Sequence, residues 1–225
     1  EGLAPGAPLV VVLHGCTQDA EAHAAAGGWL TLADRLGVVV LAPEQTAANN
    51  PNRCFNWFEP GDTRRGEGEA ASIAAMVAHC VRTHGLDASR VFVTGLSAGG
   101  AMAAAMLAAY PEVFAGGAVV AGLPYGAAGN MQEAFGAMQG RHALSGAELG
   151  ALVRGAGPAG APLPRLTIWQ GDADRTVHPR NGEVLARQWA TAHGLAERPD
   201  AVERLANRVR SVWRSAGGEA VLEYN

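Results

Sequence analysis

The sequence has 225 residues, is 48% hydrophobic and has a mean hydropathy of +0.05, which is enough apolar content to bury the core of one sizeable domain. Its 17 basic residues are all arginines scattered along the chain, and the net charge is -4. We therefore expect neither a nucleic acid nor a membrane as a partner. No apolar segment is long enough to cross a membrane, and we predict a single domain over residues 1–225.

Short apolar segments alternate along the chain with segments of helical periodicity. The apolar segments are bounded by glycine or proline and are too continuous for half-exposed strands: residues 8–14, 38–42, 91–95, 117–121, 166–170 and 220–224. The helical segments carry apolar residues three and four positions apart: residues 67–84, 98–109, 182–193 and 200–215. Strand followed by helix, repeated, predicts an α/β fold with a mostly parallel central sheet flanked by helices.

Residues 123–164 interrupt this alternation. They are rich in glycine, alanine and proline, and their one predicted helix, over residues 145–153, begins with Ser145 as its cap. We expect this lid-like excursion to cross the edge of the sheet, where it could form a wall of a substrate site.

A Gly-x-Ser-x-Gly motif at residues 95–99 joins a buried strand to an alanine-rich helix. This is the pattern of a nucleophile elbow, in which a strained turn projects the serine hydroxyl outward. Gly95 and Gly99 permit the close approach of strand and helix that such a turn requires. Ser97 is therefore the predicted nucleophile, and a capping serine at a helix start is the alternative interpretation.

Attack by a serine on an ester places negative charge on the former carbonyl oxygen, which needs fixed N–H donors. We assign one donor to the backbone of Ala98 and the second to Cys16, with Thr17 as the less favoured choice, in the loop after the first strand. His14, in the same loop, is expected to orient the turn rather than to act as a base.

A catalytic serine also needs an imidazole, which a carboxylate holds in the correct tautomer. Asp174 is the predicted carboxylate and Asp172 its rival, because both follow the strand beyond the excursion. In this type of fold the histidine follows the last strand, and neither His178 nor His193 is well placed for the role. We expect the first strands of the fold to be missing from this sequence, before Glu1, and the natural protein to continue past Asn225 with a histidine within about ten residues.

The three cysteines are too dispersed for a zinc site, and we expect neither a metal nor a cofactor. Cys16 and Cys54 both lie in predicted loops. A disulfide between them is one possibility, typical of an exported protein, and two free thiols are the other.

Several further motifs give the chain a family resemblance over about residues 8–189. They are Leu13-His14-Gly15-Cys16-Thr17-Gln18, Pro43-Glu44-Gln45, Cys54-Phe55-Asn56-Trp57-Phe58, Arg65-Gly66-Glu67-Gly68-Glu69, Ala121-Gly122-Leu123-Pro124-Tyr125-Gly126 and Ile168-Trp169-Gln170-Gly171. With the Ser97 motif, the chain resembles the esterase/poly(3-hydroxybutyrate) depolymerase family of the α/β-hydrolase superfamily. The resemblance implies the α/β-hydrolase fold, with Ser97 as nucleophile, Asp174 as acid, and Cys16 and Ala98 as the oxyanion hole.

The resemblance also implies a serine carboxylesterase that hydrolyses short-chain hydroxyalkanoate esters, as polymer or oligomer. The family is similar to feruloyl and acetylxylan esterases, so a carbohydrate esterase is one alternative; a non-catalytic α/β-hydrolase domain that binds a polymer or a protein is another. Trp57 and Phe55 lie in a loop rich in proline and asparagine, which favours contact with substrate, although packing in the core stays open. We expect a secreted protein, and the oligomeric state is left undetermined.

Overall fold

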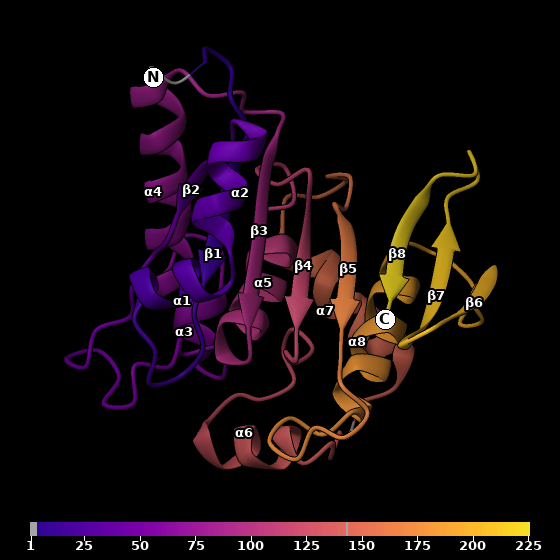
Figure 1. Ribbon diagram of the computed structural model, residues 1–225. Helices are drawn as coiled ribbons and strands as arrows, with labels where there is room; N and C mark the ends of the chain where they lie inside the picture. Colours follow the sequence, from indigo (N-terminus) through magenta and orange to yellow (C-terminus); the bar gives the residue numbers. More distant parts are fainter. Residues whose placement is uncertain (1–3, 143) are drawn as a thin grey trace.

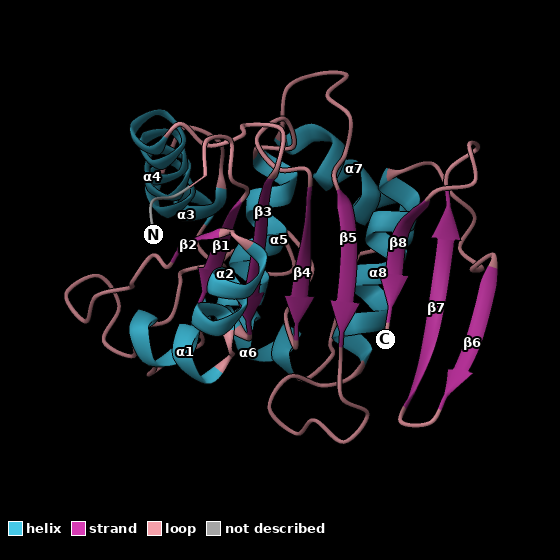
Figure 2. Cartoon of the chain, turned by 45° about the horizontal axis from the view of Figure 1, so that its top comes forward, coloured by secondary structure: helices cyan, strands magenta, loops and turns pink. Residues whose placement is uncertain are grey.

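The computed structural model describes residues 4–142 and 144–225, and within them the chain folds around one central sheet (Figures 1 and 2). The expectation about the first strands concerns the chain before Glu1, outside the described residues. The eight strands found in the described part of the chain have the order β2-β1-β3-β4-β5-β8-β7-β6. Their bounds are β1 Leu9–Leu13, β2 Val39–Leu41, β3 Val91–Leu96, β4 Gly116–Val120, β5 Arg165–Trp169, β6 Ala201–Leu205, β7 Arg208–Arg214 and β8 Ala220–Tyr224.

The neighbouring strands from β2 through β8 are parallel, and β7 and β6 are added antiparallel at one edge. The mostly parallel sheet predicted from the apolar segments is therefore confirmed. All the parallel strands end at the same edge, which is the lower end of the sheet in Figure 1, where the C-terminus also lies. Loops that follow these strands meet there, as expected for a site in a parallel sheet.

Helices cover both faces of the sheet. The bounds are α1 Ala20–Ala26, α2 Trp29–Leu36, α3 Pro60–Thr63, α4 Gly68–His84, α5 Ala98–Ala109, α6 Met131–Met138, α7 Gly146–Ala156 and α8 Arg180–Ala192. Figures 1 and 2 show α1 and α2 in front of the sheet, and α4, α5, α7 and α8 behind it. In the described residues, no helix is both long and apolar enough to traverse a bilayer.

Helix α5 forms the centre of the core, and every one of its residues is buried. Its alanines and glycines allow it to lie close against β3 and β4, because small side chains keep the two backbones near each other. Gly117 on β4 shows how close the helix and the strand are: a Cβ atom at this position would lie 2.8 Å from Leu107 Cδ1 on α5, inside van der Waals contact. The position of the helix behind Ser97 is thus set by small residues on both sides.

The helix predicted over residues 200–215 is wrong. These residues form the antiparallel hairpin of β6 and β7, joined by a two-residue turn at Ala206 and Asn207. Arg210 on β7 makes ion pairs with Glu203 on β6 and Glu223 on β8, at 3.0 and 2.7 Å. Valines and a short turn favour strand pairing here, and the cross-strand partners exist only in the folded sheet.

The excursion at residues 123–164 contains two helices, with residue 143 outside the described part. The predicted helix is confirmed as α7, and Ser145 and Glu148 form a capping box at its start. Helix α6 was not predicted; Asn130 caps it by accepting a hydrogen bond from the N–H of Glu133. Figure 1 shows α6 at the bottom, beside the carboxyl ends of the parallel strands. The excursion therefore borders the edge where a site is expected.

Candidate active site

Ser97 stands at a sharp turn between β3 and α5, as the motif predicted. Its backbone has φ 55° and ψ -118°, a conformation that residues other than glycine rarely adopt. The turn is held by the N–H of Ser97, which donates to Val120 O on the neighbouring strand at 2.9 Å. Strain of this kind persists only when the surrounding structure enforces it, and it is a feature of functional sites.

The two glycines of the motif are required by close backbone contacts. A Cβ atom on Gly95 would lie 2.1 Å from the carbonyl oxygen of Gly99, and one on Gly99 would lie 2.3 Å from that of Leu13. Both distances are far inside van der Waals contact. Any other residue at these positions would force the elbow apart, so the sequence motif has a direct steric cause.

The loop after β1 lies directly against Ser97. A Cβ atom on Gly15 would be 3.6 Å from Ser97 Cβ. The backbone N–H groups of Cys16 and Ala98 donate to no other group in the described part of the chain, whereas the N–H of Thr17 is used by Asn52 O at 2.7 Å. Of the two candidates in this loop, Cys16 is therefore the one with a free donor beside the serine.

His14 is buried and both of its ring nitrogens are occupied. Its Nε2 accepts from the backbone N–H of Gln45 at 3.0 Å, so Nδ1 carries the proton and donates to Gly15 O at 2.8 Å. The ring also packs against Phe55, with 5.0 Å between ring centroids. These contacts agree with an orienting role for His14 and leave it no nitrogen for proton transfer.

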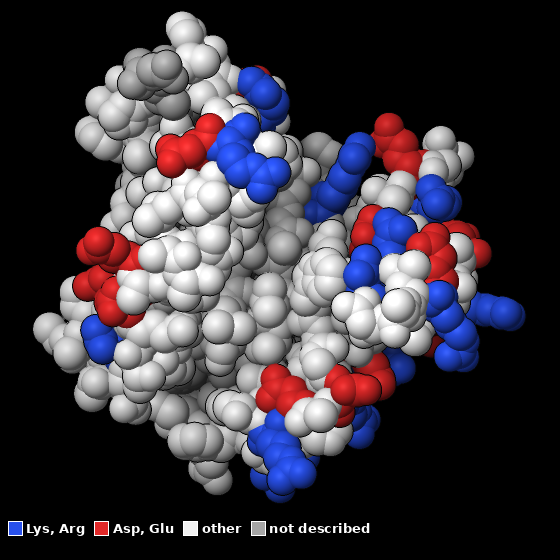
Figure 3. All heavy atoms as spheres, in the orientation of Figure 1, with Lys and Arg blue, Asp and Glu red and all other residues white. Residues whose placement is uncertain are grey.

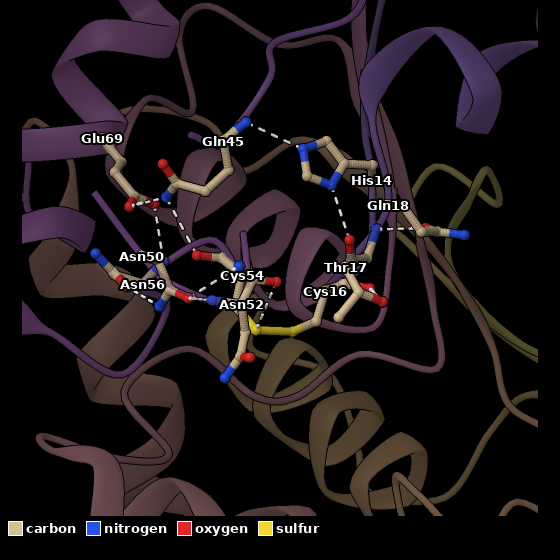
Figure 4. Close-up of a disulfide and its surroundings, with 11 residues drawn as sticks. His14, Cys16, Thr17, Gln18, Gln45, Asn50, Asn52, Cys54, Asn56 and Glu69 are labelled. Carbon is tan, nitrogen blue, oxygen red and sulfur yellow. Dashed lines mark hydrogen bonds between the residues drawn. A yellow bond between two sulfur atoms is a disulfide. The ribbon is translucent and has the colours of Figure 1, made fainter. Parts of the chain in front are cut away.

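A disulfide joins Cys16 to Cys54, across a sequence separation of 38 residues (Figure 4). Two further contacts join the same loops: the N–H of Thr17 to Asn52 O, and the guanidinium of Arg53 to Thr17 O at 2.9 Å. Thr17 and Arg53 both have positive φ angles, of 64° and 49°. The candidate oxyanion loop is thus fixed to residues 52–54 by one covalent and two hydrogen bonds.

Behind this loop lies a partly buried polar network that the sequence analysis did not identify. Gln45 Nε2 donates to Cys54 O at 3.1 Å and also to the carboxylate of Glu69 (Figure 4). Glu69 accepts two more hydrogen bonds, from Asn49 Nδ2 at 2.9 Å and from the N–H of Asn56 at 2.8 Å. Burial raises the pKa of Glu69 to about 7. In the sequence, the signal for this network is that Gln45 and Glu69 each belong to one of the motifs that carry the family resemblance.

Asp174 lies in the loop after β5, and this loop holds its carboxylate firmly. One oxygen accepts from the N–H groups of Thr176 and Val177 at 2.8 and 3.0 Å, and the other accepts from Gln170 Nε2 at 3.3 Å. Val177 is 1% exposed and belongs to the same apolar cluster as Ala98, so it anchors the loop beside the elbow. The rival Asp172 is exposed.

None of the seven histidines, all of which are described, donates a hydrogen bond to Asp174. His178 is exposed and its Nδ1 accepts from the N–H of Arg180 at 3.2 Å. His193 lies at the end of α8, where burial lowers its pKa. His142, in the excursion, bonds Asn181 Oδ1 at 2.9 Å, and burial lowers its pKa as well. In the described residues, Ser97, the N–H groups of Cys16 and Ala98, and Asp174 thus follow strands that end at one edge of the sheet, and no histidine bonds Asp174.

The predicted substrate-binding aromatics are both buried. Phe55 is 3% exposed and lies in the main core, and Trp57 is 8% exposed. Trp57 packs edge-on against Phe58 in the smaller cluster that also contains Ala98 and Val177. Such burial favours the packing alternative for both.

Two further properties concern possible ligands. Among residues 4–142 and 144–225, no group of three or more His, Cys, Asp or Glu side chains is arranged to hold a metal ion. Figure 3 shows charges of both signs gathered on the side of the β6–β7 hairpin, while the centre of the same face carries few charges. On this face there is no continuous basic track of the type that binds a phosphate backbone.

The chain is similar to a family of esterases and to several known members of it. The family model described as esterase PHB depolymerase matches residues 3–211. The poly(3-hydroxyalkanoate) depolymerase C of Paucimonas lemoignei is 45% identical over 99% of this chain, and the chain spans 54% of that protein, about half its length. Acetylxylan esterase A of Emericella nidulans is 30% identical over 95% of the chain and 73% of its own length.

Among solved structures, the acetyl xylan esterase from Aspergillus awamori superposes with a TM-score of 0.88 at 25% identity, covering 99% of this chain and 83% of that one. A likeness of this extent confirms the α/β-hydrolase fold predicted from the sequence. It covers both the parallel sheet and the β6–β7 hairpin that the sequence analysis missed.

Proposed function

Since the chain belongs to the esterase PHB depolymerase family, we propose that the protein is a serine carboxylesterase acting on short-chain hydroxyalkanoate esters, as polymer or oligomer. The observation that carries the proposal is the strained turn at Ser97, with the unused N–H groups of Cys16 and Ala98 beside it. Two donors fixed in this way suit the oxyanion of an acyl-transfer reaction.

The proposed mechanism has two steps. Ser97 Oγ attacks the ester carbonyl, its proton passes to an imidazole, and the alcohol leaves with that proton to give an acyl-enzyme; water then hydrolyses the acyl-enzyme by the same route. Cys16 and Ala98 donate to the oxyanion in both steps, and each such donor contributes roughly 3 kcal/mol to lowering the barrier. Asp174 fixes the tautomer of the imidazole and stabilises its positive charge.

The substrate class is inferred from the depolymerase of Paucimonas lemoignei, which is the most similar of the relatives described above. Release of an acetyl or feruloyl group from plant polysaccharide is the second candidate, supported by the fungal acetylxylan esterases. A non-catalytic binding domain is the third, and its support is that Asp174 has no histidine partner among the described residues. We also propose secretion, because the Cys16–Cys54 disulfide suits an oxidising compartment.

The test uses the natural protein at its full length. Wild-type protein should hydrolyse a p-nitrophenyl short-chain ester, clear dispersed poly(3-hydroxybutyrate) and react with a fluorophosphonate probe. Ser97→Ala should lower turnover by about a millionfold, because the nucleophile is lost while the fold is kept. Ser72→Ala, at an exposed serine on α4, is the matched control and should retain activity. More than a few per cent of activity in Ser97→Ala would refute a serine mechanism.

The substrates also separate the three candidates. Faster turnover of acetylated xylan or feruloyl esters than of hydroxybutyrate oligomers would favour the carbohydrate esterase. Binding of the polymer without hydrolysis or probe labelling would favour the binding domain.

A further inference from the structure

The partly buried network behind the oxyanion loop contains Gln45 and Glu69, which come from other elements. Gln45 follows β2, and Glu69 lies in the first turn of α4. Gln45 is 5% exposed and touches the loop by two routes: its backbone N–H donates to His14 Nε2, and its side chain donates to Cys54 O. His14 in turn donates to Gly15 O, and Cys54 is bonded to Cys16 (Figure 4).

Gln45 is therefore connected to both residues of the Gly15–Cys16 peptide that carries this N–H: to Gly15 through His14, and to Cys16 through Cys54 and the disulfide. Its own orientation is set by Glu69, because the carboxylate accepts from Gln45 Nε2 and thereby directs this nitrogen toward Cys54 O. Gln45 Oε1 is turned the other way, where it accepts from the N–H of Thr46 at 3.0 Å and from Asn49 Nδ2 at 3.1 Å. With both ends of the amide bound, a flip would place donor against donor.

We infer that Glu69 and Gln45 are positioning residues of the esterase, which hold the N–H of Cys16 in place for the oxyanion; this inference rests on the proposed function. They touch no reacting atom themselves. Glu69 and Gln45 are placed to affect kcat. A small displacement of an oxyanion donor weakens a hydrogen bond that is made chiefly to the charge developing in the transition state.

The hydrogen-bond partners of Glu69 favour its ionised form. Its three partners, Gln45 Nε2, Asn49 Nδ2 and the N–H of Asn56, are all donors. A carboxylate can accept all three, whereas a protonated carboxyl would present an O–H with no acceptor among them. Protonation of Glu69 should therefore loosen Gln45, and through it the loop.

The charged neighbours of Glu69 are acidic. Asp62, on α3, accepts from the N–H of Glu69 at 3.2 Å and from Asn56 Nδ2 at 3.0 Å. Glu44 lines the same cavity between the loop and α4, together with Asp62 and Glu69. No arginine lines this cavity in the described residues. The hydrogen bonds to the Glu69 carboxylate thus come from neutral donors, and burial, with the charge of Asp62, raises its pKa to about 7.

The experiment measures steady-state kinetics of full-length Glu69→Gln, Gln45→Met and the double variant on a p-nitrophenyl short-chain ester. We expect each single variant to lower kcat about tenfold or more with KM changed less than about twofold, since an interaction made mainly in the transition state is weakened. The double variant should be no slower than the slower single variant, because both changes break one chain of contacts. Below pH 7, kcat should also decrease less steeply in Glu69→Gln than in the wild type, because the variant has no carboxylate to protonate at this position.

Glu67→Gln is the matched control: it removes an exposed carboxylate two residues away that makes no side-chain cap bond, and it should leave kcat unchanged. Folded variants with wild-type kcat would overturn the inference, and so would kcat losses that multiply in the double variant. In either case, hydrolysis by the wild type would still uphold the proposed function. If Glu69→Gln does not fold, Gln45→Met decides by the same criteria. A wild-type protein that neither hydrolyses esters nor reacts with a fluorophosphonate would overturn both.

Discussion

At the scale of single residues, Asp174 and Asp172 show how two identical side chains in one loop differ in what they can do. Asp174 accepts three hydrogen bonds from its own loop, and Asp172 is exposed. A carboxylate that orients an imidazole has to be held still, since its role is geometric. The structure therefore supports Asp174 as the acid on physical grounds that spacing in the sequence could not supply.

Asp174→Asn should lower kcat by about ten-thousandfold, because an amide stabilises the wrong imidazole tautomer. Asp172→Asn is the matched control and should retain most activity. Steady-state kinetics of both variants on one soluble ester provide the comparison. A severe effect at Asp172 with a mild one at Asp174 would show that the assignment is reversed.

Glu69 should also make stability depend on pH. Burial, followed by the charge of Asp62, raises its pKa from 4.5 to about 7, against the opposing effect of the donors from Asn56, Gln45 and Asn49. Because the folded state holds the proton more tightly than the unfolded chain, the contribution of Glu69 to stability is largest below pH 4.5 and is lost as pH rises to about 7.

Denaturation of wild type and Glu69→Gln at pH 5 and pH 8 tests this dependence. The free energy of unfolding of wild type relative to the variant should be more favourable at pH 5 than at pH 8. The Glu67→Gln control should follow the wild type at both. A constant difference between wild type and Glu69→Gln would contradict the expected sign.

At the scale of elements, the sequence predicted the elbow at Ser97 correctly and the β6–β7 hairpin incorrectly, as a helix. The turn at Ser97 follows from local sequence, because glycines at two fixed positions are sterically necessary there. The segment at residues 200–215 carries apolar residues whose spacing fits a helix as well as a strand. The hairpin is favoured by its valines and short turn, and it is extended by the pairing of β7 with β8 and the contact of Arg210 with Glu223, 13 residues further along the chain.

Loss of the Cys16–Cys54 disulfide should destabilise the protein and impair its activity. Closing a loop with a separation of 38 residues is worth about 4 kcal/mol by chain entropy, so the double variant Cys16→Ser, Cys54→Ser should lose a free energy of unfolding of that order. Its kcat should also fall, because the loop that presents the N–H of Cys16 loses its covalent bond. Cys80→Ser removes the free thiol and serves as the control. Unchanged unfolding by denaturant in the double variant would contradict the prediction.

At the scale of the whole molecule, the strand order decides which loops meet. β3 delivers Ser97, β1 delivers Cys16, and β5 delivers Asp174, and all three strands end at one edge. β8 pairs in parallel with β5, and Asn225 continues that pairing through bonds with Ile168 and Gln170. Whatever follows Asn225 in the natural protein leaves the sheet at this same edge.

We predict a histidine within about ten residues after Asn225 in the gene that encodes this chain, because loops of this type in α/β sheets are short. Its replacement by alanine should abolish ester hydrolysis. His178→Gln and His193→Gln are matched controls and should remain active, since neither side chain bonds Asp174. Reading the downstream gene and assaying the three variants checks the prediction; a gene without that histidine would favour the binding domain.

The sequence by itself determined the features that depend on local chemistry: the alternating strands and helices, the Ser97 elbow and the capped helix α7. These are encoded by residues close together in the chain, through apolar periodicity, steric need for glycine and side-chain capping. Only the tertiary structure decided the hairpin at β6 and β7, the burial of Phe55 and Trp57, the Cys16–Cys54 pairing and the network of Gln45 and Glu69. Each of these depends on contacts between segments remote in sequence, and a linear pattern does not specify which remote partner a residue meets.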